Sequence, residues 1–450
     1  MILEKIKSEG LAHLSYILGD GGQAAVIDPR RDCEIYMQIA HEQGLQITHI
    51  FETHRNEDLV SGAPALSKLT GAPVHHGPNP EEEIVYADTV HEGDSFQFGS
   101  LSLRVIETPG HTFDSVSYAI HDDAFGASAV GVFTGDALFI GDVGRTDFYP
   151  DRAREVAGLL HDSLRKITAL GDQALVYPAH GAGSVCGSGM AAREFSSIGY
   201  ERRHNSMLAI ESREAFIEAK IAEQHYIPPY FKRMERLNSI GGTPVPRVLP
   251  AGPVPSGDRV PENARVIDVR DVTAFAGAHI PGALSLPEAL IPGFAGWLLK
   301  ADEPLFLIAS DPGEAERAMR HFARIGYDQV TGANIGMVAW VAGGHPFENL
   351  ETVDHRTVAK RFEDGTPNWT LLDVRAIDEV EEDRTDDSQH IYVGHLPEKL
   401  GELEKGRHYT VMCGSGVRAT IAAAYLKSRG FETLDVFLGS IGAWRTHHDG

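Results

Sequence analysis

Four apolar runs in the first 180 residues each end in a histidine or an aspartate. They cover residues 47–53, 103–110, 130–135 and 174–179, and the residues that follow them are His54, His111, Asp136 and His180. Side chains at the tips of buried strands are held rigidly and can face one crevice. Four such tips are hard to assign to chance. The sequence therefore predicts a strand-rich N-terminal domain that gathers these side chains into one site.

The motifs around these tips resemble the ligand motifs of the metallo-β-lactamase superfamily. They are Thr53-His54 followed by Asp58, Thr108-Pro109-Gly110-His111, Thr134-Gly135-Asp136 and Pro178-Ala179-His180. The resemblance covers residues 1–240 and implies an αββα sandwich as the first domain.

Two positions depart from the superfamily signature HxHxDH, because Asn56 and Leu59 stand where it has histidine. In the two-metal members, one ion takes three histidines and the other takes the Asp-His pair with the last histidine, here His180. The aspartate at the position of Asp136 bridges the two ions. Neither an amide nor an isobutyl group replaces an imidazole ligand, so the sequence disfavours a binuclear hydrolase centre.

Two imidazoles and one carboxylate remain, those of His54, His111 and Asp136. This set is the facial triad of non-haem Fe(II) oxygenases, which leaves positions open for substrate and O₂. It is similar to the persulfide dioxygenases of the same superfamily, as are the segments 144–148 and 178–184. The resemblance implies one mononuclear Fe(II) per chain, with zinc as a non-native occupant. It also implies that a thiol persulfide and O₂ react to give sulfite.

Several nearby residues have two interpretations. Asp58 and His180 either orient ligands or bound water, or form a structural pair, and Asn56 is a hydrogen-bonding group near the metal. Arg145 either binds an acidic group of the thiol substrate or forms a structural salt bridge. Cys186, in a Gly/Ser-rich loop, is either a thiol that reaches the persulfide or a small apolar residue.

A Pro/Gly-rich segment, residues 241–258, predicts a linker, and a long repeat follows it. Val266-Ile267-Asp268-Val269-Arg270 recurs 105 residues later as Leu371-Leu372-Asp373-Val374-Arg375. Short β-type runs alternate with helical patterns in both copies, which predicts two α/β domains with parallel sheets, residues 259–347 and 352–450. The acidic stretch 379–387 of the second copy is predicted to be a solvated loop.

The second copy carries a thiol motif, Cys413-Gly414-Ser415-Gly416-Val417-Arg418, between an apolar strand and a helix. Backbone N–H groups of such a loop stabilise an anion, and the helix dipole with Arg418 is expected to depress the pKa of Cys413. The motif resembles the rhodaneses, which are sulfurtransferases. Four residues between cysteine and arginine suit a sulfur atom, whereas the related phosphatases have one more.

The first copy has Ser310 in place of the cysteine and no arginine at the end of its loop. A hydroxyl has too high a pKa to accept sulfane sulfur, and Asp311 and Glu314 repel anions. We therefore expect residues 259–347 to be a catalytically silent rhodanese-like domain that acts in spacing or docking.

The net charge of −24 disfavours nucleic acids and anionic membrane surfaces as partners. Three cysteines in 450 residues argue against a secreted disulfide scaffold, and no apolar run reaches the length of a membrane span. We expect a cytoplasmic protein. The resemblance further implies a homo-oligomer, a dimer or a tetramer.

The sequence thus predicts a bifunctional enzyme that oxidises a thiol persulfide with O₂ and transfers sulfane sulfur through Cys413, interconverting thiosulfate, sulfite and thiols. Two alternatives remain open. One is a binuclear thioesterase similar to glyoxalase II. The other is a non-enzymatic sulfur carrier or sensor with a degenerate metallo domain.

Overall fold

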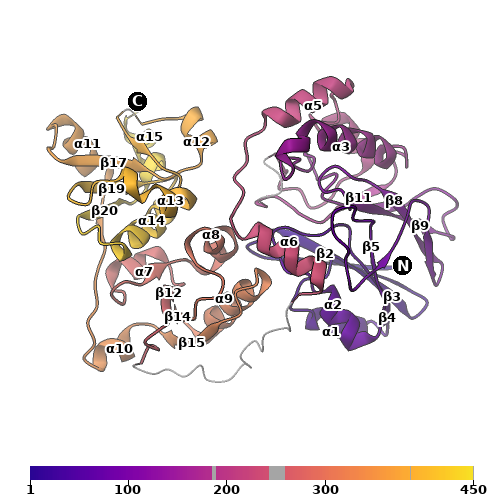
Figure 1. Ribbon diagram of the computed structural model, residues 1–450, viewed down its shortest axis with the longest axis horizontal. Coiled ribbons are helices and arrows are strands. Elements are labelled where there is room, and N and C mark those ends of the chain that lie inside the picture. Colours follow the sequence, from indigo (N-terminus) through magenta and orange to yellow (C-terminus); the bar gives the residue numbers. More distant parts are fainter. Residues whose placement is uncertain (185–188, 243–258, 386, 449–450) are drawn as a thin grey trace. The chain divides into compact units, whose positions relative to one another are not determined.

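A computed structural model of the chain describes residues 1–184, 189–242, 259–385 and 387–448 (Figure 1). The described residues form two compact units, the first with residues 1–184, 189–242 and 323–326 and the second with residues 259–322, 327–385 and 387–448. Most of the predicted linker, from residue 243 to 258, lies outside the described residues. None of the described helices is both long and apolar enough to cross a lipid bilayer.

The first unit contains two mixed sheets. The six-stranded sheet has the order β1-β2-β3-β4-β5-β6, in which β1 to β3 are antiparallel neighbours and β3 to β6 run parallel. Its strands are β1 (Ile2–Ser8), β2 (His13–Asp20), β3 (Gln23–Ile27), β4 (Gln46–Phe51), β5 (Val74–His76) and β6 (Asp88–Thr89).

The five-stranded sheet has the order β11-β10-β9-β8-β7, and only its β10–β11 pair is parallel. Its strands are β7 (Ser95–Phe98), β8 (Leu101–Glu107), β9 (Val116–Asp122), β10 (Gly131–Gly135) and β11 (Leu175–Pro178).

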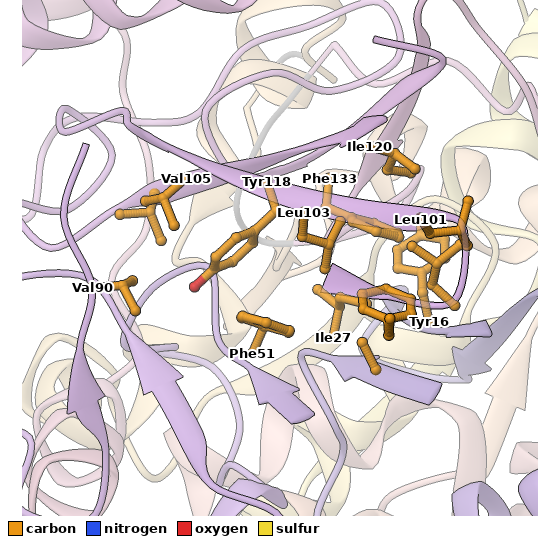
Figure 2. Packing of buried hydrophobic residues seen from close by; sticks show 14 of the residues in the cluster. Tyr16, Ile27, Phe51, Val90, Leu101, Leu103, Val105, Tyr118, Ile120 and Phe133 are labelled. Atoms are coloured by element: carbon orange, nitrogen blue, oxygen red, sulfur yellow. The ribbon is translucent and has the colours of Figure 1, made fainter. Parts of the chain in front are cut away.

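Apolar side chains from both sheets meet in one core, which Figure 2 shows from close by. The six-stranded sheet contributes Tyr16, Ile27 and Phe51, and the other sheet contributes Leu103 and Phe133, all at most 2% exposed. Each strand presents alternate residues to this layer because side chains alternate between the faces of a strand. The sheets are thereby fixed face to face, and the ends of their strands meet along one edge.

Helices cover the outer faces of both sheets (Figure 1). α1 (Glu34–Glu42) and α2 (Ala63–Thr70) pack on the six-stranded sheet, and α3 (Ala153–Thr168) packs on the other, with α5 (Arg213–Ala222) beside α3. The unit also contains α4 (Ile198–His204) and α6 (Phe231–Ile240). The predicted αββα sandwich is confirmed.

The second unit contains two parallel sheets, which confirms the prediction for the repeat. The first copy has the strand order β13-β12-β14-β15 and the second β16-β20-β19-β17-β18. The recurring Asp-Val-Arg has a structural reason, since Asp268 and Asp373 each form a buried forked ion pair with the arginine two residues on.

The elements of the first copy are β12 (Arg265–Asp268), α7 (Val272–Gly277), β13 (Leu284–Ser285), α8 (Ile291–Leu298), β14 (Leu305–Ala309), α9 (Pro312–Arg324), β15 (Val330–Ile335) and α10 (Val338–Ala342). Those of the second are β16 (Glu351–Val353), α11 (His355–Glu363), β17 (Trp369–Asp373), α12 (Ile377–Glu382), β18 (Gln389–His390), α13 (Leu396–Lys399), β19 (His408–Met412), α14 (Val417–Ser428), β20 (Leu434–Phe437) and α15 (Ser440–His448). The prediction that residues 379–387 form a loop is wrong at its start, because α12 includes Glu379 to Glu382.

Candidate functional site

Strand ends of the first unit bring three potential metal ligands together. His54 follows β4, His111 follows β8 and Asp136 follows β10. One ligand atom from each residue lies within 4.8 Å of the other two, and all three side chains are buried. Within the described parts of the chain, this is the single such group of histidine, cysteine, aspartate and glutamate side chains.

In His54 and His111, only one of the two ring nitrogens forms a hydrogen bond. Thr53 Oγ1 donates to Asp28 Oδ2 at 2.9 Å and therefore accepts from His54 Nδ1 at 2.9 Å. His111 Nδ1 lies 2.9 Å from the carbonyl oxygen of Arg145, an acceptor, so it carries the proton. The Nε2 atoms of both histidines are buried without hydrogen-bond partners. Hydrogen bonds at the opposite ring nitrogen fix the tautomer that a metal requires.

His180 contacts Asp136 through one ring nitrogen and Asp58 through the other. His180 Nδ1 is 2.8 and 2.9 Å from the two oxygens of Asp136, and its Nε2 is 3.0 Å from Asp58 Oδ2. Burial alone would raise the pKa of Asp136, but the charge and hydrogen bond of His180, together with His54 and His111, hold that pKa well below its usual value. The carboxylate is therefore ionised and oriented.

The two positions that lack the expected histidines are both buried. Asn56 and Leu59 are 3% and 2% exposed, and the backbone carbonyl oxygens of both accept hydrogen bonds from Asn238 Nδ2 at 2.7 Å. The side-chain oxygen of Asn56 has no hydrogen-bond partner. Neither residue offers an imidazole for a second ion.

The guanidinium of Arg145 has contacts within the protein. It forms a forked pair with Asp147 at 2.7 and 2.6 Å, donates to the carbonyl oxygen of Tyr226 at 3.1 Å and lies over the ring of Phe148. Its arrangement is that of a structural salt bridge, and its predicted role in substrate binding stays a prediction. Cys186 lies outside the described residues.

Two features of this centre were not predicted from sequence. The first is the chain Asp28–Thr53–His54, for which the signal was a threonine directly before the ligand. The second is Glu57, whose carboxylate Oε2 lies 3.7 Å from His111 Nε2. Glu57 stands inside the motif at a position that is not a ligand in the superfamily, so no sequence signal distinguished it.

We expect Thr53→Val to weaken metal binding by about 10- to 100-fold, because groups that hydrogen-bond to metal ligands have effects of this size. Valine keeps the shape of the side chain but gives His54 Nδ1 no acceptor. Metal affinity is measured by competition with a chelator. Thr70→Val is the matched control, since its hydroxyl bonds to Leu66 within α2. Equal affinities of both variants and wild type would contradict the role of Thr53.

The thiol motif forms a tight loop between β19 and α14. Cys413 follows β19 and is 1% exposed, and Gly416, directly before α14, has φ of +112°. That angle is unfavourable for a residue with a Cβ. The N–H of Gly416 donates to Cys413 Sγ at 3.1 Å. The loop thus directs a backbone N–H and the N-terminus of α14 at the sulfur.

The segment before and at the start of α15 supports the loop. The N–H of Cys413 donates to Ser440 Oγ at 3.0 Å, and the N–H of Gly439 donates to the carbonyl oxygen of Ser415 at 2.9 Å. The N–H of Gly442 donates to the carbonyl oxygen of Gly414 at 3.2 Å. The start of α15 and the residue before it therefore hold the shape of the thiol loop.

Arg418 forms an ion pair with Glu379 of α12, at 2.5 and 2.7 Å. Burial opposes its charge, but this pair raises the pKa of Arg418, so it stays cationic. A Cβ on Gly414 would lie 3.4 Å from Arg418 Nη2, which places the guanidinium against the loop. The guanidinium of Arg418 that an anionic sulfur donor would contact at this loop is already paired with Glu379.

The corresponding loop of the first copy is occupied by its own carboxylate. Ser310 follows β14, and its N–H donates to the side chain of Glu314. The N–H of Glu314 in turn donates to Asp311 Oδ1 at 2.9 Å. A carboxylate therefore binds the backbone N–H at the position that corresponds to Cys413, and the silence of this domain stays a prediction.

Comparisons with known proteins follow the same division of the chain. Residues 9–180 match the model of the metallo-beta-lactamase superfamily, and residues 258–343 and 354–447 match that of the rhodanese-like domain. A metallo-beta-lactamase from Staphylococcus aureus subsp. aureus COL has a similar structure, with a TM-score of 0.67 and 29% identity over 75% of this chain and 99% of that chain.

Two kinds of curated relative are similar to the N-terminal part. Hydroxyacylglutathione hydrolase of Rhodospirillum rubrum is 36% identical over 160 residues, which are 35% of this chain and 57% of the relative. Mitochondrial persulfide dioxygenase of Bos taurus is 33% identical over 185 residues, 37% of this chain and 63% of the relative. The chain spans less than two thirds of either relative.

Proposed function

Because the N-terminal domain of this chain belongs to the metallo-β-lactamase superfamily and two rhodanese-like domains follow it, we propose that the protein is a persulfide dioxygenase joined to a sulfurtransferase. One observation carries the proposal. His54, His111 and Asp136 form a buried set of two imidazoles and one carboxylate. The Nε2 atoms of its two histidines have no hydrogen-bond partner. That donor set is typical of non-haem iron oxygenases.

The residues fit a single metal ion. His54, His111 and Asp136 would hold it, and the buried Nε2 atoms without partners are the atoms that a metal would satisfy. The superfamily implies metal binding, and we propose one Fe(II) per chain because positions 56 and 59 lack imidazoles. Bound Fe(II) would supply the redox chemistry that joins O₂ to sulfur.

The overall reaction is balanced when one water is consumed: RSSH + O₂ + H₂O gives RSH and sulfurous acid, which ionises to sulfite. The terminal sulfur is oxidised, O₂ is reduced and the S–S bond breaks. His180 keeps Asp136 ionised and in position, while Thr53 and the carbonyl of Arg145 keep the two imidazoles in the required tautomer.

Cys413 performs the second reaction of the proposal. Its thiolate attacks the outer sulfur of thiosulfate, the S–S bond of thiosulfate breaks, and sulfite leaves with the bonding electron pair. The product is a cysteine persulfide, whose outer sulfur a small thiol can take up. The Gly416 N–H and the start of α14 stabilise the anion at each stage.

The two reactions share their intermediates, which gives the fusion a chemical reason. A thiol persulfide is the product of sulfur transfer and the substrate of oxidation, and sulfite is released by both. A cavity of about 560 Å³ in the first unit has His180, Tyr16 and Lys5 in its wall. His54, His111 and Asp136 do not line this cavity, and His180, which contacts Asp136, connects it to the metal centre.

The test supplies anaerobically reconstituted protein with glutathione persulfide and O₂. The proposal predicts that O₂ consumption and sulfite formation occur in a ratio of about one to one, as the balanced equation requires. If O₂ and persulfide both disappear no faster than they do without enzyme, the proposal is rejected.

The hydrolase relatives support a second candidate, cleavage of a thioester. That reaction requires two metal ions in the superfamily members with the full signature, and here Asn56 and Leu59 replace two of the ligands. Incubation with a glutathione thioester separates the candidates, because the dioxygenase leaves it intact and the hydrolase releases free thiol.

A further inference from the structure

In the motif where Asn56 and Leu59 replace two histidines, a carboxylate, that of Glu57, stands between these two positions. Glu57 is 1% exposed, and neither of its carboxylate oxygens has a hydrogen-bond partner. An ionised carboxylate is costly to bury unless it is paired, hydrogen-bonded or bound to a metal. The partner of this carboxylate within the protein is His111, whose Nε2 lies 3.7 Å from Glu57 Oε2.

The carboxylate of Glu57 lies next to the metal-facing nitrogen of His111. Its Oε2 lies 3.7 Å from His111 Nε2, and Asp136 Oδ2 lies 3.4 Å from the same nitrogen and 3.8 Å from His54 Nε2. Donor atoms that share an ion at about 2.0–2.2 Å are roughly 3 to 4 Å apart. The carboxylate thus approaches the triad from the side of His111. The donor atoms that all lie within 4.8 Å of one another are those of His54, His111 and Asp136, so a shared ion would draw Glu57 closer to His54 and Asp136 than it lies here.

The neighbouring cation, Arg55, interacts with Glu57 through its charge but donates no hydrogen bond to it. The backbone N–H of Arg55 donates to Asp114 Oδ2 at 2.7 Å, and its guanidinium lies 3.9 Å from Glu235 Oε2. Although Arg55 is the residue of opposite charge in the motif, both oxygens of Glu57 accept no hydrogen bond.

We propose that Glu57 is a fourth protein ligand of the metal ion, which makes the centre one of two imidazoles and two carboxylates. The inference rests on the proposed metal centre and adds to it. The two-metal signature has a histidine ligand at position 56. In the proposed centre, the carboxylate of Glu57, one position later, binds the ion instead. Two carboxylates match the charge of a divalent cation and, as harder donors, favour Fe(II) and Mn(II) relative to an all-imidazole set.

Metal titration of the full-length protein tests the proposal without any catalytic assay. The metal-free protein is titrated with Co(II), whose visible bands report its ligands, and with Mn(II). We expect Glu57→Gln to weaken both affinities by about 10-fold or more and to change the Co(II) spectrum. Glu235→Gln, the matched control, removes a charge beside Arg55 and is expected to bind as wild type does. Wild-type affinity and an unchanged spectrum in Glu57→Gln would overturn the assignment.

A third variant separates this inference from the centre on which it rests. If His111→Ala loses Co(II) binding and Glu57→Gln does not, only the role of Glu57 is wrong. If the wild type itself binds no ion, the metal centre is wrong as well. Should Glu57→Gln fail to fold, a crystal structure of the metal-loaded wild type decides, since a ligand oxygen lies within about 2.3 Å of the ion. A Glu57 oxygen farther than about 3 Å overturns the proposal.

Discussion

We expect the variant His111→Ala to lose its metal and its proposed persulfide oxidation but to keep sulfur transfer at Cys413. His111 is fully buried, its Nδ1 is fixed by the carbonyl of Arg145, and its Nε2 faces both His54 and Asp136. Removing it leaves two protein donors in the triad, too few for a stable site. We expect a loss of metal content to below about a tenth of wild type and a fall in O₂ consumption of at least ~100-fold.

Two measurements on one preparation check this result: metal content with O₂ uptake, and thiosulfate-to-thiol transfer. Retained transfer shows that the second unit is folded, and His91→Ala is the matched control for the first unit because His91 lies on its surface. Equal loss of both activities in His111→Ala would mean that the two reactions depend on one centre, which contradicts two independent sites.

We expect the variant Cys413→Ala to abolish sulfur transfer and to leave metal binding and the proposed persulfide oxidation intact. In the proposed reaction the sulfur of Cys413 is the nucleophile, and neither the loop N–H groups nor Arg418 can form the persulfide without it. Loss of a covalent nucleophile removes at least ~10³-fold of the rate. The assay follows transfer from thiosulfate to a thiol, with glutathione persulfide oxidation measured in parallel.

Cys33→Ala is the control for this variant. Cys33 is buried beside α1, and burial raises the pKa of its thiol to about 11, so it is not a nucleophile at neutral pH. Transfer in Cys33→Ala is expected at the wild-type rate. Residual transfer in Cys413→Ala above about a hundredth of wild type would indicate a second sulfur-accepting thiol.

Most of the fold was predictable because its signals are local. Apolar runs that end in His54, His111 and Asp136 are strands whose tips meet. The repeat of Asp-Val-Arg marks the same strand in both parallel sheets.

The features that were missed depend on contacts between distant residues. Glu379 belongs to a charge-rich stretch that is typical of a loop, yet it lies in α12 and pairs with Arg418, 39 residues away. Glu57 is adjacent to expected ligands, but only the three-dimensional arrangement shows that its carboxylate faces His111 and accepts no hydrogen bond. Spacing along the chain carries no information about either contact.

A mononuclear iron centre that oxidises persulfide is tested most directly by metal analysis of the full-length protein purified without O₂, combined with an oxygen-electrode trace after addition of glutathione persulfide. We predict about one iron per chain and O₂ uptake that increases in proportion to iron content. Two zinc ions per chain, with thioester cleavage and no O₂ uptake after iron reconstitution, would contradict this assignment.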